Sequence, residues 1–252
     1  MPEYDPASYG RDWAQIYDDF FRAQLPDEKD CIECLTTLVG RGPVLELGIG
    51  TGRVGLPLAR RNVQVHGLEG SPEMVTKLRE KPGGEDLVVH IGDLADVAVE
   101  GEYTLIFATL NTLFFVTNQN DQVRCFVNVA RHLSSNGLFV VEAAVPPSGS
   151  GRGIQVYDLR SDRVVLQVHQ RDHVTQRTFQ QVVIMEQNGR MRLIPQTNRY
   201  IWPSELDLMA KLAGLRLRER WGDWRRGPFT SSSVKHISVY EFGRDESLSA
   251  RD

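Results

Sequence analysis

The sequence of 252 residues has only three cysteines, Cys31, Cys34 and Cys125. Cys31 and Cys34 form a C-x-x-C pair, a spacing typical of thioredoxin-like motifs and of half-sites for zinc. The chain has no second cysteine pair or histidine pair that would complete a tetrahedral site. We therefore expect no metal site, and we interpret the pair as two small residues on a helix.

An excess of positive charge is also missing, because 29 lysines and arginines face 33 acidic residues, for a net charge of -4. A field of this sign does not attract phosphates, so we expect no nucleic-acid partner. The first thirty residues lack the basic segment and apolar stretch of a signal peptide, and no run is long enough to span a membrane. These absences predict a cytoplasmic protein with no membrane partner.

The length and composition fit one globular domain with an insertion, since 41% of the 252 residues are hydrophobic and 25% are charged. The first forty residues are predicted to form a helical cap. Residues 5–21 carry aromatic and apolar side chains at helical spacing, and a second helix is expected over 27–39. The first of these helices would present Trp13, Ile16, Tyr17, Phe20 and Phe21 on one side.

Between residues 43 and 145, short apolar runs alternate with helical patterns. Strands are predicted over 44–47, 63–67, 87–91, 103–108 and 138–142. Helices are predicted over 53–61, from the Ser71-Pro72 cap onward, and over 121–133, with Asn136-Gly137 turning the chain into the fifth strand. Strands that alternate with helices predict a parallel sheet covered on both faces.

The pattern changes after Pro146, where proline, glycine and serine form a flexible break. An antiparallel β insertion is expected over 154–202, with strands at 164–170, 177–186, 190–194 and 199–202. Asn188-Gly189 predicts a hairpin within it. Residues 203–243 would supply a helix capped by Ser204 and closing strands over 215–221 and 234–242, and residues 244–252 a polar tail.

A glycine-rich loop follows the first strand, in the segment Glu46-Leu47-Gly48-Ile49-Gly50-Thr51-Gly52-Arg53. Glycines allow a sharp turn and a close approach to a ligand, and ligands of open parallel sheets bind at the carboxyl ends of the strands. Residues 50–55 also match the dinucleotide fingerprint G-x-G-x-x-G, which leaves a nicotinamide-dependent oxidoreductase open. Three acids at successive strand ends favour S-adenosylmethionine instead: Glu46, Glu69 and Asp93.

These motifs in this order resemble those of the class I S-adenosylmethionine-dependent methyltransferases. The resemblance covers about residues 43–145. It implies an α/β fold with a Rossmann-like seven-stranded sheet, helices on both faces and an antiparallel β insertion after the fifth strand, all in one methyltransferase domain over 1–252.

The same resemblance implies roles for individual residues. Gly48, Ile49 and Gly50 would line the methionine part of the cofactor, in a motif completed by Gly52 and Arg53. Glu69 would bind the ribose, Gly70 and Met74 would flank the adenosine, and Asp93 with Leu94 would frame the adenine. Thr109 and Leu110 would lie at the edge that faces the sulfonium. Solvated turn acids are the alternative for Glu69 and Asp93.

The methyl acceptor is less defined. The N/D/S-P-P-Y/F motif of nucleic-acid methyltransferases is absent after the fourth strand, which argues against adenine or cytosine. The layout resembles the small-molecule branch, including amino-sugar N-methyltransferases and glycine N-methyltransferase, which share a tyrosine-containing N-terminal helix and an antiparallel insertion. That resemblance implies a small-molecule acceptor, N- or O-methylation, and a possible homodimer through the β insertion.

Transfer from a sulfonium requires mainly in-line positioning and exclusion of water. Asn111, His169 and His173 are the catalytic candidates, although a lone histidine on a strand is more often structural. Tyr17 either contacts the cofactor or the acceptor, or packs the helix onto the core. The aromatic and basic loop that contains Arg225-Arg226 either walls the acceptor pocket or is a solvated face. A tRNA or protein acceptor, and a cofactor-binding regulator that transfers nothing, remain alternatives.

Overall fold

A seven-stranded sheet forms the centre of the molecule in the computed structural model, which describes residues 7–21, 27–146, 149 and 151–243. Its strand order is β10-β11-β5-β4-β1-β2-β3. Strands β1 to β5 pair in parallel, and β11 pairs antiparallel with β5 and β10. The bounds are β1 Val44–Leu47, β2 Val65–Glu69, β3 Val88–Ile91, β4 Tyr103–Ala108, β5 Leu133–Ala144, β10 Leu215–Trp221 and β11 Lys235–Phe242.

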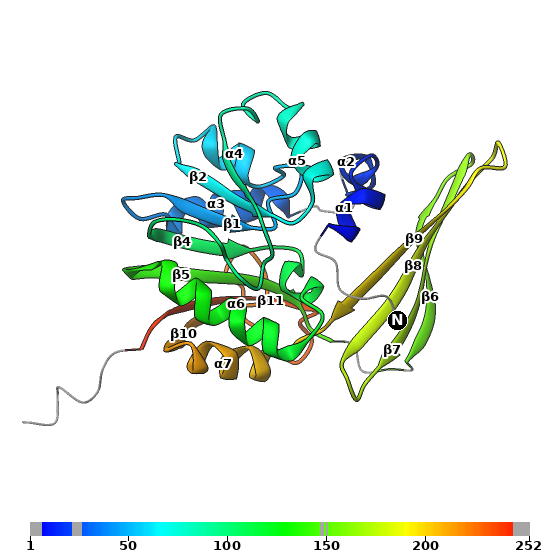
Figure 1. The fold of residues 1–252 in the computed structure, drawn as a ribbon. Helices are drawn as coiled ribbons and strands as arrows, with labels where there is room; N and C mark the ends of the chain where they lie inside the picture. The colour runs from blue at the N-terminus through cyan, green and yellow to red at the C-terminus, as the bar shows by residue number, and fades with distance from the viewer. Residues whose placement is uncertain (1–6, 22–26, 147–148, 150, 244–252) are drawn as a thin grey trace, which may run out of the picture.

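Helices cover both faces of this sheet, as predicted (Figure 1). On one face, α6 (Gln119–His132) and α7 (Pro203–Leu212) bury side chains such as Phe126 and Met209. On the other face, α3 (Glu28–Leu38) and α4 (Gly55–Ala59) bury theirs. The shorter elements are α1 Ser8–Trp13, α2 Tyr17–Phe21, α5 Pro72–Arg79 and the 3₁₀ helix η1 Thr112–Phe115.

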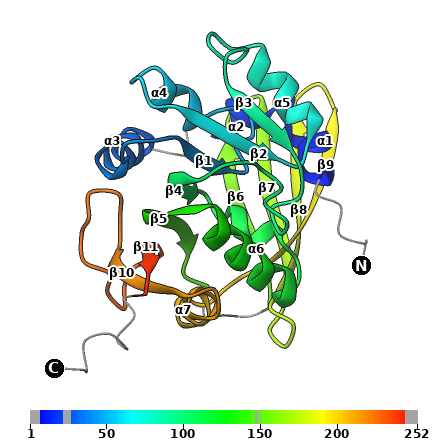
Figure 2. The same ribbon diagram turned by 60° about the vertical axis from the view of Figure 1, so that its left-hand side comes forward.

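A second, four-stranded antiparallel sheet follows β5, as expected for the insertion. It consists of β6 Arg152–Leu159, β7 Arg163–Asp172, β8 Arg177–Glu186 and β9 Met191–Arg199, paired in chain order. Figures 1 and 2 show it standing beside the carboxyl ends of the central strands, with α1 and α2 near its inner face. Trp13 and Phe20 pack there against Val165, Val182 and Ile194, in a small core of their own.

Several predicted boundaries were wrong. The N-terminal helix is divided into α1 and α2, with an i→i+3 hydrogen bond from Ile16 N to Trp13 O at the break. β2 begins two residues later than predicted, because Asn62 has a φ of 63° and Val63 N–H still closes the preceding helix onto Leu58 O. α4 is correspondingly shorter than the predicted 53–61.

Three further predictions were also corrected. Asn136-Gly137 lies within β5, in a bulge where the partners of Tyr103 and Leu105 jump from Leu133 to Leu138. α7 begins at Pro203, so Ser204 is not its N-cap. The fourth strand of the insertion is β6, and residues 199–202 add no strand beyond the end of β9 at Arg199.

None of the helices in the described residues has the length and apolar character that a membrane span requires. Across the same residues, no group of histidine, cysteine or acidic side chains is arranged to hold a metal ion. Cys31 and Cys34 are free and buried on α3, which confirms their interpretation as small helical residues.

Candidate active site

The glycine loop lies where the sequence predicts it, between the carboxyl end of β1 and α4. Gly48 and Gly50 have φ angles of 70° and 55°, a left-handed conformation that side chains disfavour. A Cβ atom at Gly50 would lie 3.5 Å from the Cε of Met74, a predicted cofactor residue on α5. The loop therefore brings Gly50 beside the first turn of α5, while Gly48 faces Thr112 of η1.

Glu69 ends β2 directly beside this loop. Its Oε2 accepts a hydrogen bond of 2.8 Å from Gly50 N, and its Oε1 accepts one of 2.9 Å from Ser71 N. The side chain is 8% exposed, which contradicts the alternative of a solvated turn acid. Burial raises the pKa of Glu69, while the backbone amides of Ser71, Gly50 and Gly70 oppose that rise.

Glu46 on β1 is the most perturbed acid of the site. Burial raises the pKa of its carboxyl group to about 8, against the attraction of Arg53 and a hydrogen bond from the backbone of Gly55. Its Oε2 atom is buried and has no hydrogen-bond partner in the described residues. A buried, unpartnered carboxylate oxygen is costly unless a ligand completes its hydrogen bonding.

Two polar side chains of helix α2, Asp18 and Tyr17, contact the glycine loop, and Asp18 also contacts Lys81 after α5. Thr51 Oγ1 donates a 2.7 Å hydrogen bond to Asp18 Oδ1, and Lys81 Nζ lies 2.6 Å from Asp18 Oδ2. Tyr17 hydrogen-bonds Arg53, and burial raises the pKa of the Tyr17 phenol. Tyr17 also lines the cavity at the carboxyl ends of β4 and β5. This tyrosine, predicted either to contact a ligand or to pack the helix onto the core, therefore lies next to both the loop and the cavity.

Helix α1 packs over the start of α5 at Gly10. A Cβ atom at Gly10 would lie 1.9 Å from Ser71 Oγ, so only glycine permits this approach. The predicted cap of α5 is confirmed, since Ser71 Oγ accepts a hydrogen bond from Met74 N. The two N-terminal helices thus cover the ends of β1 and β2.

Asp93 and Leu94 follow β3 at the same edge of the sheet. Gly92 N donates to Glu69 O at 3.0 Å, which holds the ends of β2 and β3 together. Asp93 Oδ1 accepts from Ala95 N at 2.8 Å and so organises the turn. The structure therefore brings together the acids that the sequence analysis took from three separate strand ends.

The end of β4 forms the opposite side of the site. Arg53 Nη2 donates to Thr109 Oγ1 at 3.2 Å, linking this strand end to the glycine loop. Leu110 and Asn111 both have positive φ angles, 49° and 62°. Asn111 Oδ1 accepts a 2.6 Å hydrogen bond from Ala144 N at the end of β5, so the side chain joins two neighbouring strand ends.

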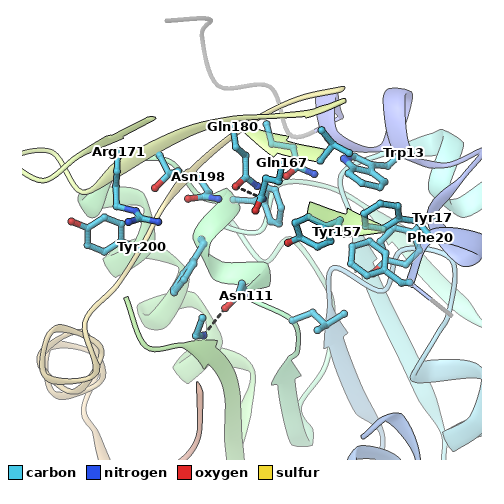
Figure 3. Close-up of a pocket in the computed structure, with 18 of the residues that line it drawn as sticks. Trp13, Tyr17, Phe20, Asn111, Tyr157, Gln167, Arg171, Gln180, Asn198 and Tyr200 are labelled. Atoms are coloured by element: carbon cyan, nitrogen blue, oxygen red, sulfur yellow. Dashed lines mark hydrogen bonds between the residues drawn. The ribbon is translucent and has the colours of Figure 1, made fainter. Parts of the chain in front are cut away.

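A cavity of about 250 Å³ lies between these strand ends, α1–α2 and the inner face of the insertion (Figure 3). Aromatic side chains surround one part of it, and amide side chains of β7, β8 and β9 with Arg171 and Tyr200 surround another. The polar lining residues in the insertion are Tyr157, Gln167, Arg171, Thr178, Gln180, Gln196, Asn198 and Tyr200. Leu110 and Asn111 line it from the side of β4, so of the three catalytic candidates Asn111 reaches the cavity.

The two candidate histidines lie beside the cavity, with His169 on the inner face of β7 in the row of Gln180 and Gln196. His169 packs over Gly153 of β6, where a Cβ atom would lie 2.7 Å from the His169 ring, and partial burial with the nearby Arg171 lowers its pKa. His173 is exposed, and its Nδ1 lies 3.1 Å from the hydroxyl of Tyr200. Neither histidine lines the cavity, whereas their neighbours Arg171 and Tyr200 do.

Sequence reasoning missed the insertion's amide side chains. Only Gln167 alternates with apolar neighbours, Leu166 and Val168, so the sequence carries a signal on β7 but none for Gln180 or Gln196. The loop that contains Arg225-Arg226 instead contacts α3, where Arg225 pairs with Asp30 at 2.7 Å, and none of its residues lines the cavity.

Known proteins resemble this chain at the level of sequence and of fold. Residues 44–137 match the model of a methyltransferase domain. The CcbJ methyltransferase from Streptomyces caelestis is 36% identical, with a TM-score of 0.91 over 95% of this chain and 100% of that one. The chain belongs to the class I S-adenosylmethionine-dependent methyltransferases.

Two further relatives agree with this assignment. A cypemycin N-terminal methyltransferase from Streptomyces is 25% identical over 205 residues, which are 79% of this chain and 82% of that protein. An S-adenosylmethionine-dependent methyltransferase from Clostridium acetobutylicum is 16% identical and shares the fold, with a TM-score of 0.79 over 92% of this chain and 98% of that one. The predicted family, fold and enzyme class are confirmed, and the oxidoreductase alternative finds no support among these relatives.

Proposed function

We propose that this enzyme transfers the methyl group of S-adenosylmethionine to an amine nitrogen of a small molecule held in the cavity beneath the insertion. The observation that supports this most directly is the cavity itself. It extends from the ends of β4 and β5 to the insertion, and Tyr17 joins it to the glycine loop.

The residues around the glycine loop fit the cofactor. Glu46 offers a buried oxygen without a partner, which suits an ammonium group, and Arg53 with Tyr17 suits a carboxylate. We assign Gly48, Ile49, Gly50, Gly52 and Thr109 to the walls of this site. Glu69 would hold the ribose hydroxyls, Gly70 and Met74 the adenosine, and Asp93 and Leu94 the adenine, while Leu110 would lie beside the sulfonium. When bound, the cofactor supplies an activated methyl group.

The lining of the cavity favours nitrogen as the acceptor atom. The described residues that line it include no histidine, aspartate or glutamate that could act as a general base. A hydroxyl group needs a base before it attacks, whereas a neutral amine already has a lone pair. The positive charge of Arg171 in the lining also disfavours the ammonium form of a bound amine. Asn111 would then orient the acceptor from the end of β4, and His169 and His173 would act only through Arg171 and Tyr200.

The names of the relatives agree with this choice. One is called an N-terminal methyltransferase, and two solved structures of the same fold are a sugar N-methyltransferase and an amino pentose methyltransferase. Their acceptors differ, so they support nitrogen methylation of a small acceptor without naming one for this chain. A nucleic-acid acceptor is not proposed, and a tRNA or protein acceptor gains nothing from these relatives.

Two measurements test the proposal. Calorimetric titration should show tight binding of S-adenosylhomocysteine and none of NADH. Incubation with methyl-labelled S-adenosylmethionine and a panel of small primary and secondary amines should transfer label, while the corresponding alcohols remain unlabelled. Binding of the cofactor without transfer to any amine, alcohol or thiol would instead support a regulator that transfers nothing.

A second copy of this chain is the proposed protein partner, bound through the outer face of the insertion. Ile154 and Val168 are paired neighbours on that face, and both are exposed, as are Val156 and Leu193. Adjacent exposed apolar side chains on a sheet indicate an interaction surface. Sedimentation velocity should detect a dimer that Ile154→Glu dissociates and that Val174→Glu, at an exposed turn, leaves intact. A monomeric wild-type protein would refute the proposed dimer. Cell fractionation tests the predicted cytoplasmic location.

A further inference from the structure

The inner face of the insertion changes in polarity from one row of side chains to the next. Strand register places Gln167, Val182 and Ile194 opposite one another on β7, β8 and β9. Gln180 and Gln196 are paired in the next row, and Arg171, Thr178 and Asn198 in the row after that. The face therefore passes from apolar, beside Trp13 and Phe20, through amide to cationic.

The amides of this face are linked in one direction. Gln167 Nε2 donates to Gln180 Oε1 at 2.7 Å, and Gln180 Nε2 donates to Gln196 Oε1. These two hydrogen bonds occupy the side-chain oxygens of Gln180 and Gln196. The amide NH2 group of Gln196 remains at the end of the row. Donors therefore collect in the part of the cavity that Arg171 and Asn198 also line.

Arg171 provides the positive charge of this part of the cavity. Within the described residues, no carboxylate pairs with its guanidinium group. Its neighbour in sequence, Asp172, lies on the other face of the strand and accepts hydrogen bonds from Val174 N and Thr175 Oγ1. Figure 3 shows the Arg171 side chain reaching toward Tyr200 at the end of the cavity away from Tyr17 and Phe20.

In the part of the chain that the structure describes, the other titratable side chains near Arg171 include no acid that pairs with it. His169 lies two residues before Arg171 on the same face of β7, in the row of Gln180. The Nδ1 atom of His173 lies 3.1 Å from the hydroxyl of Tyr200. Arg199 on β9 is committed to Glu205 at 2.7 Å. A partly buried guanidinium without an acidic partner favours a bidentate anion over a neutral group.

We infer that the acceptor carries a carboxylate, or an equivalent planar oxyanion, which Arg171 binds at the end of the cavity with the amides of Gln196 and Asn198 beside it. This inference rests on the proposed function, since it concerns the molecule that the methyltransferase cavity holds. The acceptor is then an amino acid-like molecule: an apolar body among the aromatic side chains, an amine toward Asn111, and an acid group on Arg171.

Matched pairs of amines test the inference, each pair consisting of a free acid and its primary amide: phenylalanine and phenylalaninamide, tyrosine and tyrosinamide, glycine and glycinamide. Methyl transfer from labelled S-adenosylmethionine gives kcat/KM, and calorimetry gives binding to the S-adenosylhomocysteine complex. We expect the wild-type enzyme to favour the acids by about tenfold or more, because a charge-assisted bidentate contact is lost in the amides.

Variants at Arg171 distinguish the effect of losing its positive charge from the effect of disturbing the fold. Arg171→Gln should abolish the preference, and Arg171→Lys should retain part of it, both with unchanged affinity for S-adenosylhomocysteine. Arg192→Gln, an exposed residue of β9, is the matched control and should behave as wild type. The inference is overturned if the amides are methylated as well as the acids, if Arg171→Gln keeps the preference, or if no acid binds the complex at about 10 mM. Failure of the proposed function differs, because then neither member of any pair would be methylated.

Discussion

Asp18 of α2 accepts a 2.7 Å hydrogen bond from the hydroxyl of Thr51 in the glycine loop. Lys81, at the end of α5, lies against the other oxygen of the same carboxylate and also donates to Thr51 O at 2.8 Å. One acidic side chain thus joins the N-terminal helices to two elements of the central domain. These helices are attached to the glycine loop by polar contacts, while their apolar side chains Trp13 and Phe20 pack against the insertion.

Removal of the Asp18–Thr51 contact should loosen helices α1 and α2 over the glycine loop without disrupting the hydrophobic core of the central domain. We expect Asp18→Ala to weaken S-adenosylhomocysteine binding by about 0.5–1.5 kcal/mol, the range for one net hydrogen bond. Stopped-flow fluorescence should show faster dissociation with little change in association. Asp12→Ala, at an exposed position of α1, is the control. Equal dissociation rates in all three proteins would mean that α2 does not retain the cofactor.

Glu69 should matter both to the loop and to the cofactor. Glu69→Ala removes the acceptor of Gly50 N and Ser71 N, and we expect cofactor affinity to fall by about 1–3 kcal/mol. Glu69→Gln keeps one acceptor oxygen and should lose less. Calorimetry with S-adenosylhomocysteine measures both, with Glu85→Ala as an exposed control. An unchanged affinity in Glu69→Ala would refute the assignment of the ribose site.

Glu46 predicts a proton linkage. Its folded-state pKa, raised from 4.5 to about 8, means that the folded protein holds a proton that the unfolded chain releases, so its contribution to stability declines as pH rises between these values. An ammonium group bound beside it favours the carboxylate, so cofactor binding should release up to one proton near neutral pH and strengthen as pH approaches 8.

Calorimetry in two buffers of different ionisation enthalpy measures this release. The Glu46→Gln variant should release no proton, and its unfolding free energy should vary less with pH between 4.5 and 8 than that of the wild type. Identical binding enthalpies in the two buffers for the wild-type protein would show that the cofactor does not contact Glu46.

Asn111 should contribute to stability as well as to the cavity. Asn111→Ala leaves Ala144 N without its acceptor and places alanine at a φ of 62°, so we expect a loss of about 1–3 kcal/mol in urea unfolding. Asn111→Gly relieves the backbone strain and should lose less. A loss of methyl transfer in both variants, with cofactor affinity intact, would identify a positioning role toward the acceptor. Full activity in both would exclude one.

Some motifs that depend on local backbone chemistry were predictable from the sequence, although the Asn136-Gly137 turn and the Ser204 cap were not. The Ser71-Pro72 cap, the Asn188-Gly189 hairpin and the glycine loop each formed where expected, because their conformations depend on a few adjacent residues. The order of acids at Glu46, Glu69 and Asp93 was predictable for the same reason, since each follows or lies within a short apolar strand.

Strand β6 was not predictable, because its glycines indicated a break. In the structure, Gly153 pairs with His169, and the histidine ring occupies the space that a side chain at Gly153 would need. The cavity was hidden for a related reason. Gln167, Gln180 and Gln196 lie on three strands, and only the register of those strands turns all three inward.

The insertion leaves the central domain at Ala144 and returns at Arg199, and one amide side chain holds each point. Asn111 Oδ1 accepts from Ala144 N, and Gln122 Nε2 donates to Arg199 O at 3.1 Å. Both amides belong to segments that follow β4, and neither to the strands that carry the glycine loop or Glu69. The insertion can therefore vary along its inner face without a change in the strands that carry the glycine loop and Glu69, provided that it keeps an apolar contact for Trp13 and Phe20.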